Sequence, residues 1–118
     1  MVDPSAGVQK VANEGRCRVC GVPGRLAPIG ILNRAHLVSR SRGGDDLDDN
    51  LVPLCGSGNT GCHGAFDFQS PMTTSPSLWR VSAEEVSRVL WSRLTPEERF
   101  YVITKENLAW AERRFRLT

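Results

Sequence analysis

The chain has 118 residues, 40% of them hydrophobic, and a formal net charge of +2. A chain of this length builds one modest core, so we expect one domain with flanking segments. No apolar run approaches membrane-spanning length, and none follows Met1 as a leader would, so the sequence predicts a cytoplasmic protein with no membrane contact. The small net charge does not by itself indicate a nucleic-acid partner.

Arginine dominates the basic residues. Lys10 and Lys105 are the two lysines among 15 basic residues, so the other 13 are arginine. The planar guanidinium group matches phosphate oxygens, which favours a phosphate-bearing partner. A genome rich in arginine codons would give the same composition, and the composition does not separate these two explanations.

Three parts follow one another along the chain: residues 1–15, 16–71 and 72–118. The first part mixes proline, serine, glycine and polar residues without a period, and predicts a loose tail. The second part is interrupted by glycine and proline. Its two short apolar runs, Ile29–Leu32 and Leu51–Leu54, predict two brief strands.

A polar loop, Ser39–Asn50, is expected between these strands. Gly43 and Gly44 permit a sharp reversal of the chain. Four aspartates follow them: Asp45, Asp46, Asp48 and Asp49. The sequence lacks the ligand spacing and terminal glutamate of a calcium-binding loop, so we interpret these aspartates as solvated side chains.

The third part is predicted to be helical. Ser82 with Glu85 and Thr95 with Glu98 both have the spacing of a capping box, and Pro96 takes the favourable first position of the second helix. Apolar residues at helical spacing give these helices a face to bury. They are Val86, Val89, Leu90 and Leu94, and later Leu108, Ala111 and Phe115.

The tryptophans and the last arginines of this part each have two interpretations. The tryptophans are Trp79, Trp91 and Trp110. They could stack on bases, but packing in a core or interface is the commoner use. The arginines are Arg113, Arg114 and Arg116. They could contact phosphates, but their position at a helix end favours interaction with the helix dipole.

The four cysteines form two pairs, Cys17 with Cys20 and Cys55 with Cys62. Two disulfide bonds are the alternative in a secreted protein, but Cys-x-x-Cys spacing suits tetrahedral thiolate ligation better. Four thiolates would complete the shell of a Zn²⁺ ion and leave no open position, so this zinc would be structural. His63 beside Cys62 could instead replace one cysteine in that shell.

Three segments together resemble the HNH endonuclease family, in particular its short cysteine-bearing bacteriophage members: Ala35–Gly44, Asp49–Cys55 and Gly61–Gly64. A histidine, an asparagine and a second histidine in this order, with interleaved cysteine pairs, rarely arise together by chance. The resemblance covers about residues 16–70, and the region 95–115 resembles more weakly the helical tail of some such phage proteins.

The resemblance implies an α+β fold, with a zinc-stapled ββα-metal core of treble-clef-like form and a C-terminal helical extension. His36 falls on the position of the general base, at the end of the first strand, and imidazole exchanges protons near neutral pH. Asn50 falls where the side-chain amide ties the loop to itself and aims the histidine. His63 falls on the helix ligand position, and Asp67, four residues later, shares its face and could ligate the same cation.

The catalytic cation implied by the resemblance is divalent, such as Mg²⁺, Mn²⁺ or Ni²⁺. Many family members carry Asp or a second His just before the general base, whereas this chain has Ala35, which cannot ligate. Water and substrate oxygens could complete the shell, a carboxylate from elsewhere could enter it, or catalysis could be weakened or lost. The hard oxygen ligand Asp67 favours Mg²⁺ or Mn²⁺ over Zn²⁺.

The sequence therefore predicts a metal-dependent DNA endonuclease of low sequence specificity, in which His36, Asn50 and His63 are catalytic. Three arginines flank the base and could contact phosphate or simply aid solubility: Arg34, Arg40 and Arg42. The resemblance suggests genome cleavage during packaging in an infected bacterial cell, with phage packaging proteins as partners. The alternatives are a non-catalytic zinc-containing DNA-binding module on a degenerate HNH scaffold and a zinc domain that binds other proteins.

Overall fold

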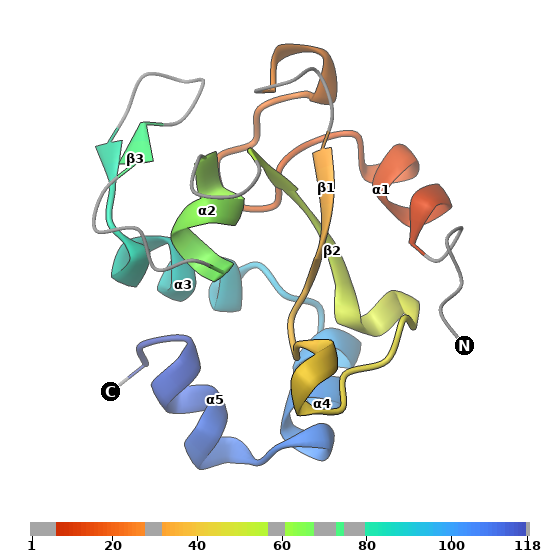
Figure 1. Ribbon diagram of the computed structural model, residues 1–118, viewed down its shortest axis with the longest axis vertical. Helices are drawn as coiled ribbons and strands as arrows, with labels where there is room; N and C mark the ends of the chain where they lie inside the picture. The colour runs from red at the N-terminus through yellow and green to blue at the C-terminus, as the bar shows by residue number, and fades with distance from the viewer. Residues whose placement is uncertain (1–6, 28–31, 57–60, 68–72, 75–79, 118) are drawn as a thin grey trace.

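The computed structural model of the protein combines a small two-stranded sheet with short helices (Figure 1). It describes residues 7–27, 32–56, 61–67, 73–74 and 80–117. None of the helices in these ranges is long and apolar enough to cross a membrane. Trp79 lies outside the described residues.

The central hairpin consists of β1 (Leu32–His36) and β2 (Leu51–Cys55), which pair antiparallel with Leu32 opposite Cys55 and His36 opposite Leu51. Every residue of β2 is buried. Helix α2 (Gly61–Asp67) follows and packs on β2. His36 therefore ends the first strand, as the resemblance implied.

The second predicted strand is confirmed, and the described strand β1 begins at the last residue of the first predicted run and continues to His36. The described strand β1 shares only Leu32 with the expected run Ile29–Leu32, and residues 29–31 lie outside the described residues. The strand instead contains Arg34, which is exposed, next to Ala35, which is 1% exposed. A strand that buries one face carries polar residues on the other, so the apolar run alone did not show that the strand continues to His36.

The N-terminal segment differs from the predicted loose tail. Residues Val8–Glu14 form helix α1, which contacts both strands of the hairpin. Gly7 precedes it with a φ of 74°, and a Cβ there would lie 2.7 Å from Leu51 Cδ1. The helix has only seven residues between two left-handed glycines, Gly7 and Gly15, which is too short to show a clear hydrophobic period.

The C-terminal helices are confirmed. Helix α3 (Ala83–Ser92) begins where the Ser82 hydroxyl accepts a hydrogen bond from Glu85 N–H, and α4 (Pro96–Lys105) begins with a complete Thr95 capping box. Helix α5 (Leu108–Arg114) follows. The remaining described elements are the short pair β3 (Thr73–Thr74) and β4 (Arg80–Val81) and the 3₁₀ turns η1 (Gly24–Leu26), η3 (Arg40–Arg42) and η4 (Asp48–Asn50).

One hydrophobic core joins the hairpin, α2 and the C-terminal helices. Phe66 of α2 stacks on Phe115, just after α5, with ring centroids 5.6 Å apart. Trp91 of α3 lies 4.9 Å from the Phe115 ring on the same measure. The packing use predicted for Trp91 is thus observed, and the C-terminal helices are part of the core that supports α2.

A buried carboxylate, Glu98, joins distant parts of the chain. Its side chain is 1% exposed and lies 2.6 Å from Arg18 Nη1 and 2.7 Å from Lys10 Nζ. It also accepts the reciprocal capping hydrogen bond from Thr95 N–H at 2.7 Å. Burial raises the pKa of Glu98, but the hydrogen bonds from Arg18 and Lys10 outweigh it and hold this pKa below its ordinary value.

We predict that Glu98→Gln lowers the free energy of unfolding by about 3 kcal/mol at pH 7, because it leaves Arg18 and Lys10 without their buried counter-charge. Glu97→Gln, at an exposed position of the same helix, should have little effect. Since the pKa of Glu98 is lowered on folding, its contribution is complete above about pH 4.3 and is lost as the pH falls through the lower folded value. Chemical denaturation of the two variants measures the free energy of unfolding. Equal values for Glu98→Gln and Glu97→Gln would contradict this prediction.

Candidate metal centres and catalytic cavity

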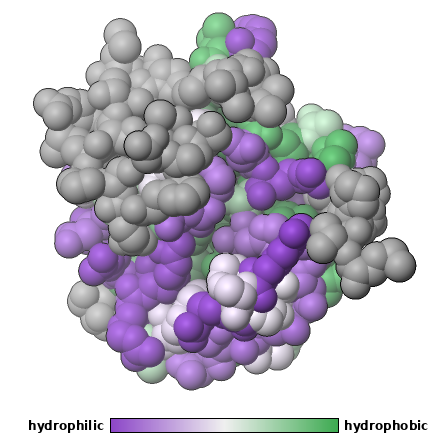
Figure 2. Space-filling view, viewed as in Figure 1, coloured by the Kyte–Doolittle hydropathy of each residue, from purple (hydrophilic) through white to green (hydrophobic). Residues whose placement is uncertain are grey.

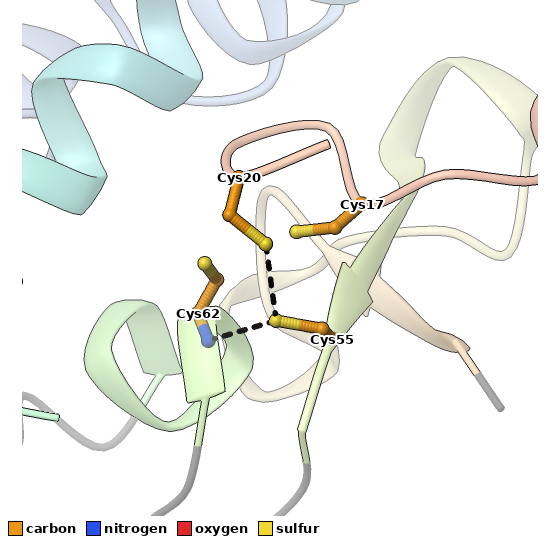
Figure 3. Close-up of side chains that lie close together, drawn as sticks. All are labelled: Cys17, Cys20, Cys55 and Cys62. Carbon is orange, nitrogen blue, oxygen red and sulfur yellow. Dashed lines mark hydrogen bonds between the residues drawn. The ribbon is translucent and has the colours of Figure 1, made fainter. Parts of the chain in front are cut away.

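The four cysteine side chains point toward one another (Figure 3). Their Sγ atoms all lie within 4.8 Å of one another, and those of Cys20 and Cys55 are 3.6 Å apart. Tetrahedral thiolates at about 2.3 Å from a zinc ion are about 3.8 Å apart. The geometry and the all-sulfur donor set therefore fit a tetrahedral metal ion.

Tight backbone turns bring these cysteines together. Between Cys17 and Cys20 the chain forms a knuckle, in which Cys17 N–H donates to Val22 O and Gly21 N–H donates to Cys17 O. Cys55 ends β2, and Cys62 lies in the first turn of α2. Gly61 has a φ of 65°, and a Cβ there would lie 2.6 Å from Cys55 O, so this approach needs glycine.

The thiols strongly perturb one another. Hydrogen bonds from the other three thiols lower the pKa of Cys17, and the bond from Cys20 has the largest effect. The hydrogen bond with Cys17 is in turn the main reason that the pKa of Cys62 is raised. Four thiolates cannot share so small a buried space without a cation to balance their charge. The cysteines are thus positioned to bind a metal ion.

His36 contacts a carboxylate of the polar loop. Its Nε2 lies 2.8 Å from Asp46 Oδ1, and Arg40 bonds both oxygens of the same carboxylate at 3.1 Å. The hydrogen bond from His36 is the main reason that the pKa of Asp46 lies below its ordinary value. Asp46 was interpreted as solvated, but its side chain is only 15% exposed. Sequence spacing alone gave no sign that the loop folds back onto the strand end.

Asn50 is fully buried and ties the loop to the segment that follows His36. Its Oδ1 accepts from Val38 N–H at 2.8 Å, and its Nδ2 donates to Val38 O at 2.9 Å and to Asp45 O at 2.8 Å. Gly44 makes this closure possible, because a Cβ there would lie 1.9 Å from Val38 O. The direction of the chain just after His36 is fixed by these contacts.

On α2, His63 and Asp67 lie one turn apart, with His63 Nε2 2.7 Å from Asp67 Oδ2. A nitrogen and a carboxylate oxygen this close can ligate one cation together. Among the described residues, however, the cysteines are the only cluster of three or more potential ligands. His63 and Asp67 therefore offer two ligands, which suits a cation that keeps water or takes substrate oxygens.

A cavity of about 750 Å³ joins the hairpin to the helices. Its lining consists of His36, Leu37, Ser39, Arg40, Arg42, Asp67, Trp110 and Arg114. The lower half of the face in Figure 2, over η3 and α5, is mostly hydrophilic. Residues from both halves of the predicted site, His36 and Asp67, thus meet at one cavity.

The three predicted phosphate-contacting arginines separate into two places. Arg40 and Arg42 line the His36 cavity, whereas Arg34 lines a different, largely apolar hollow beside α1. Trp110 and Arg114 are additional residues of the His36 cavity. The sequence offered base stacking by Trp110 and phosphate contact by Arg114 only as the less favoured interpretations, because their approach to the site depends on how α5 folds back onto α2.

Residues 17–65 match the model of the HNH endonuclease family. The match includes all four cysteines, both histidines and Asn50, and it confirms the resemblance seen in the sequence. Residues 17–65 are thus similar to an HNH domain, which suggests nuclease or DNA-binding activity with metal binding. No match was found among curated proteins or among solved structures.

We predict one tightly bound zinc ion per chain. Its removal by a strong chelator at neutral pH should collapse the cooperative melting transition, because four clustered thiols then lose their common counter-charge. Elemental analysis and melting curves test this, and added Zn²⁺ but not Mg²⁺ should restore the transition. A metal-free protein that melts like the purified one would contradict the prediction.

Proposed function

We propose that this protein is a metal-dependent endonuclease that hydrolyses DNA phosphodiester bonds on a zinc-stapled ββα-metal fold. The observation that carries the proposal is the single cavity lined by both His36, from the hairpin, and Asp67, from α2. The family match over residues 17–65 supports the same activity.

His36 acts as the general base. Because its Nε2 is engaged by Asp46, we infer that Nε2 carries the proton and that Nδ1 takes the proton of the attacking water. Asp46 fixes the orientation and the tautomer of the imidazole ring, as a carboxylate does when it accepts a hydrogen bond from the second ring nitrogen of a functional histidine. Arg40 keeps Asp46 ionised and in place.

Asn50 is a positioning residue. Its three hydrogen bonds hold Val38 and Asp45 in fixed relation, and both lie close in the chain to the interacting pair His36 and Asp46. The amide therefore aims the base without contacting the substrate.

His63 and Asp67 would hold the catalytic cation, with Mg²⁺ or Mn²⁺ favoured by the carboxylate. When bound, such an ion polarises the phosphate and steadies the leaving oxygen. The resemblance implies products with a 5′-phosphate and a 3′-hydroxyl. Ala35 is 1% exposed and paired with Val52, so water and substrate oxygens, rather than this position, would complete the shell.

In this proposal the four cysteines hold a structural zinc ion away from the chemistry. Arg40 and Arg42 would contact DNA phosphates at the cavity, whereas Arg34 would do so only outside it. Genome cleavage with phage packaging proteins, in the cytoplasm of an infected cell, is proposed on the resemblance alone.

A second candidate is a DNA-binding module that has lost catalysis. Ala35 favours it, since a common family ligand is missing there. In that case the arginines would still bind DNA, but no cation would promote cleavage.

We predict that the zinc-loaded protein nicks supercoiled plasmid only when a divalent cation such as Mg²⁺, Mn²⁺ or Ni²⁺ is added. His36→Ala should slow nicking by at least about a hundredfold, because general-base catalysis contributes about that much. Unchanged zinc content and melting temperature are the controls. Equal nicking by both proteins would refute His36 as the base.

Asp46→Asn tests the positioning of His36. We expect about a ten- to hundredfold slower nicking, because an amide can donate a hydrogen bond to Nε2 and so favour the wrong tautomer. Asp49→Asn, at an exposed position of the same loop, is the matched control and should keep the parent rate. Similar rates for the two variants would remove Asp46 from the mechanism.

A further inference from the structure

A second hollow adjoins the His36 cavity. It measures about 440 Å³ and is lined by Trp110, Arg113, Arg114 and Arg116. Trp110 and Arg114 line both cavities, so the two form one continuous surface. This second hollow is built by α5 and the residue Arg116 beyond it, outside the segment 17–65 that matches the family model.

Arg114 stands where the two cavities meet. Its guanidinium lies 3.8 Å from the centroid of the Phe66 ring, Nη2 donates to Phe66 O at 2.9 Å, and Nη2 is 3.6 Å from Asp67 Oδ1. Its Nη1 is buried without a hydrogen-bond partner among the described residues. Burial is also the main reason that the pKa of Arg114 is lowered, since desolvation disfavours the cation.

The helix-dipole interpretation does not account for this arrangement. A dipole contact would leave Arg114 beside the last carbonyls of its own helix, whereas its guanidinium packs over α2. An anion at the cavity would give the buried nitrogen an acceptor. Arg113 and Arg116 are exposed and line the second hollow with Arg114, but they do not line the cavity that contains His36.

Trp110 and Arg42 form the wall between η3 and α5. The Arg42 guanidinium lies 5.2 Å from the Trp110 ring centroid and makes two hydrogen bonds to Glu106, at 3.1 and 3.0 Å. These contacts hold the beginning of the polar loop against the C-terminal helices. Arginine side chains therefore line both cavities, from Arg40 beside His36 to Arg116 in the second hollow.

We propose that α5 and the residue Arg116 carry a phosphate-binding subsite for the DNA strand, with Arg114 at its inner end and Arg113 and Arg116 at its outer end. It rests on the proposed function, because the strand whose phosphate lies near His36 continues along this surface. Neighbouring phosphates recur every few ångströms along a strand, so a second set of guanidinium groups can bind the next ones. The subsite binds phosphate oxygens and reads no base sequence.

The test measures binding in the absence of cleavage. The zinc-loaded protein, without added divalent cation, is titrated against a fluorescently labelled DNA duplex at several salt concentrations. The variant is Arg113→Gln with Arg116→Gln. The control is Arg25→Gln with Arg88→Gln, which removes the same charge from exposed arginines that line neither cavity.

We expect the Arg113/Arg116 variant to bind at least about tenfold more weakly at 0.1 M salt. The slope of log affinity against log salt should become shallower by about 1.8, or about 0.9 for each lost phosphate contact. The control should shift both quantities much less. Equal shifts in the two variants would overturn the subsite, since only total charge would then matter.

Arg114→Lys examines the inner end. It keeps the charge but loses the planar fork that packs over Phe66, so we expect weaker DNA binding by the folded, zinc-loaded variant together with a lower melting temperature. Parent-like affinity would show that Arg114 serves packing alone. Because none of these assays involves cleavage, the subsite can fail while His36-dependent nicking stands, and the reverse also holds.

Discussion

The close approach of four cysteine sulfur atoms constrains how the rest of this fold is arranged. Cys17 and Cys20 lie in the N-terminal knuckle, Cys55 ends β2, and Cys62 opens α2, so one ion in this cage would fix three separate segments. Without it, four thiols would have to crowd together with no opposing charge. A chain of 118 residues has a modest core, so a metal ion bound by these cysteines would be a large part of what holds its sheet and helix in register.

That cysteine cluster also bears on where the proposed catalytic groups lie. β2 begins next to Asn50 and ends at Cys55, while α2 carries His63 and Asp67 just beyond Cys62. Asn50 then ties the far end of the hairpin to the turn after His36. The sulfur cluster at one end and the Asn50 hydrogen bonds at the other thus set the relation between the end of β1 and helix α2. Glu98 adds a third connection, through Arg18 within the knuckle.

Sequence alone predicted the features that depend on local chemistry. The cysteine spacing, the caps at Ser82 and Thr95 and the second strand all follow from neighbouring residues, and the structure contains them. It did not predict helix α1 or the contact of Asp46 with His36, and the apolar run did not show how far β1 continues beyond Leu32. Those depend on pairing and loop closure across the fold. Arg114 was named in the sequence as a possible phosphate contact, but the helix-dipole interpretation was preferred, since its distance from the HNH segment in sequence hides its contact with α2.

The proposed nuclease requires two separate ion positions, one among sulfurs and one beside the imidazoles. The chain has only two histidines, so their ring protons give a simple nuclear magnetic resonance spectrum. Adding Mn²⁺ to the zinc-loaded protein should broaden the signals of both His63 and His36, because the ion binds His63 and Asp67 next to the cavity that His36 lines, while zinc stays bound. Unbroadened histidine signals at millimolar Mn²⁺, or release of zinc in parallel with broadening, would contradict a distinct catalytic cation.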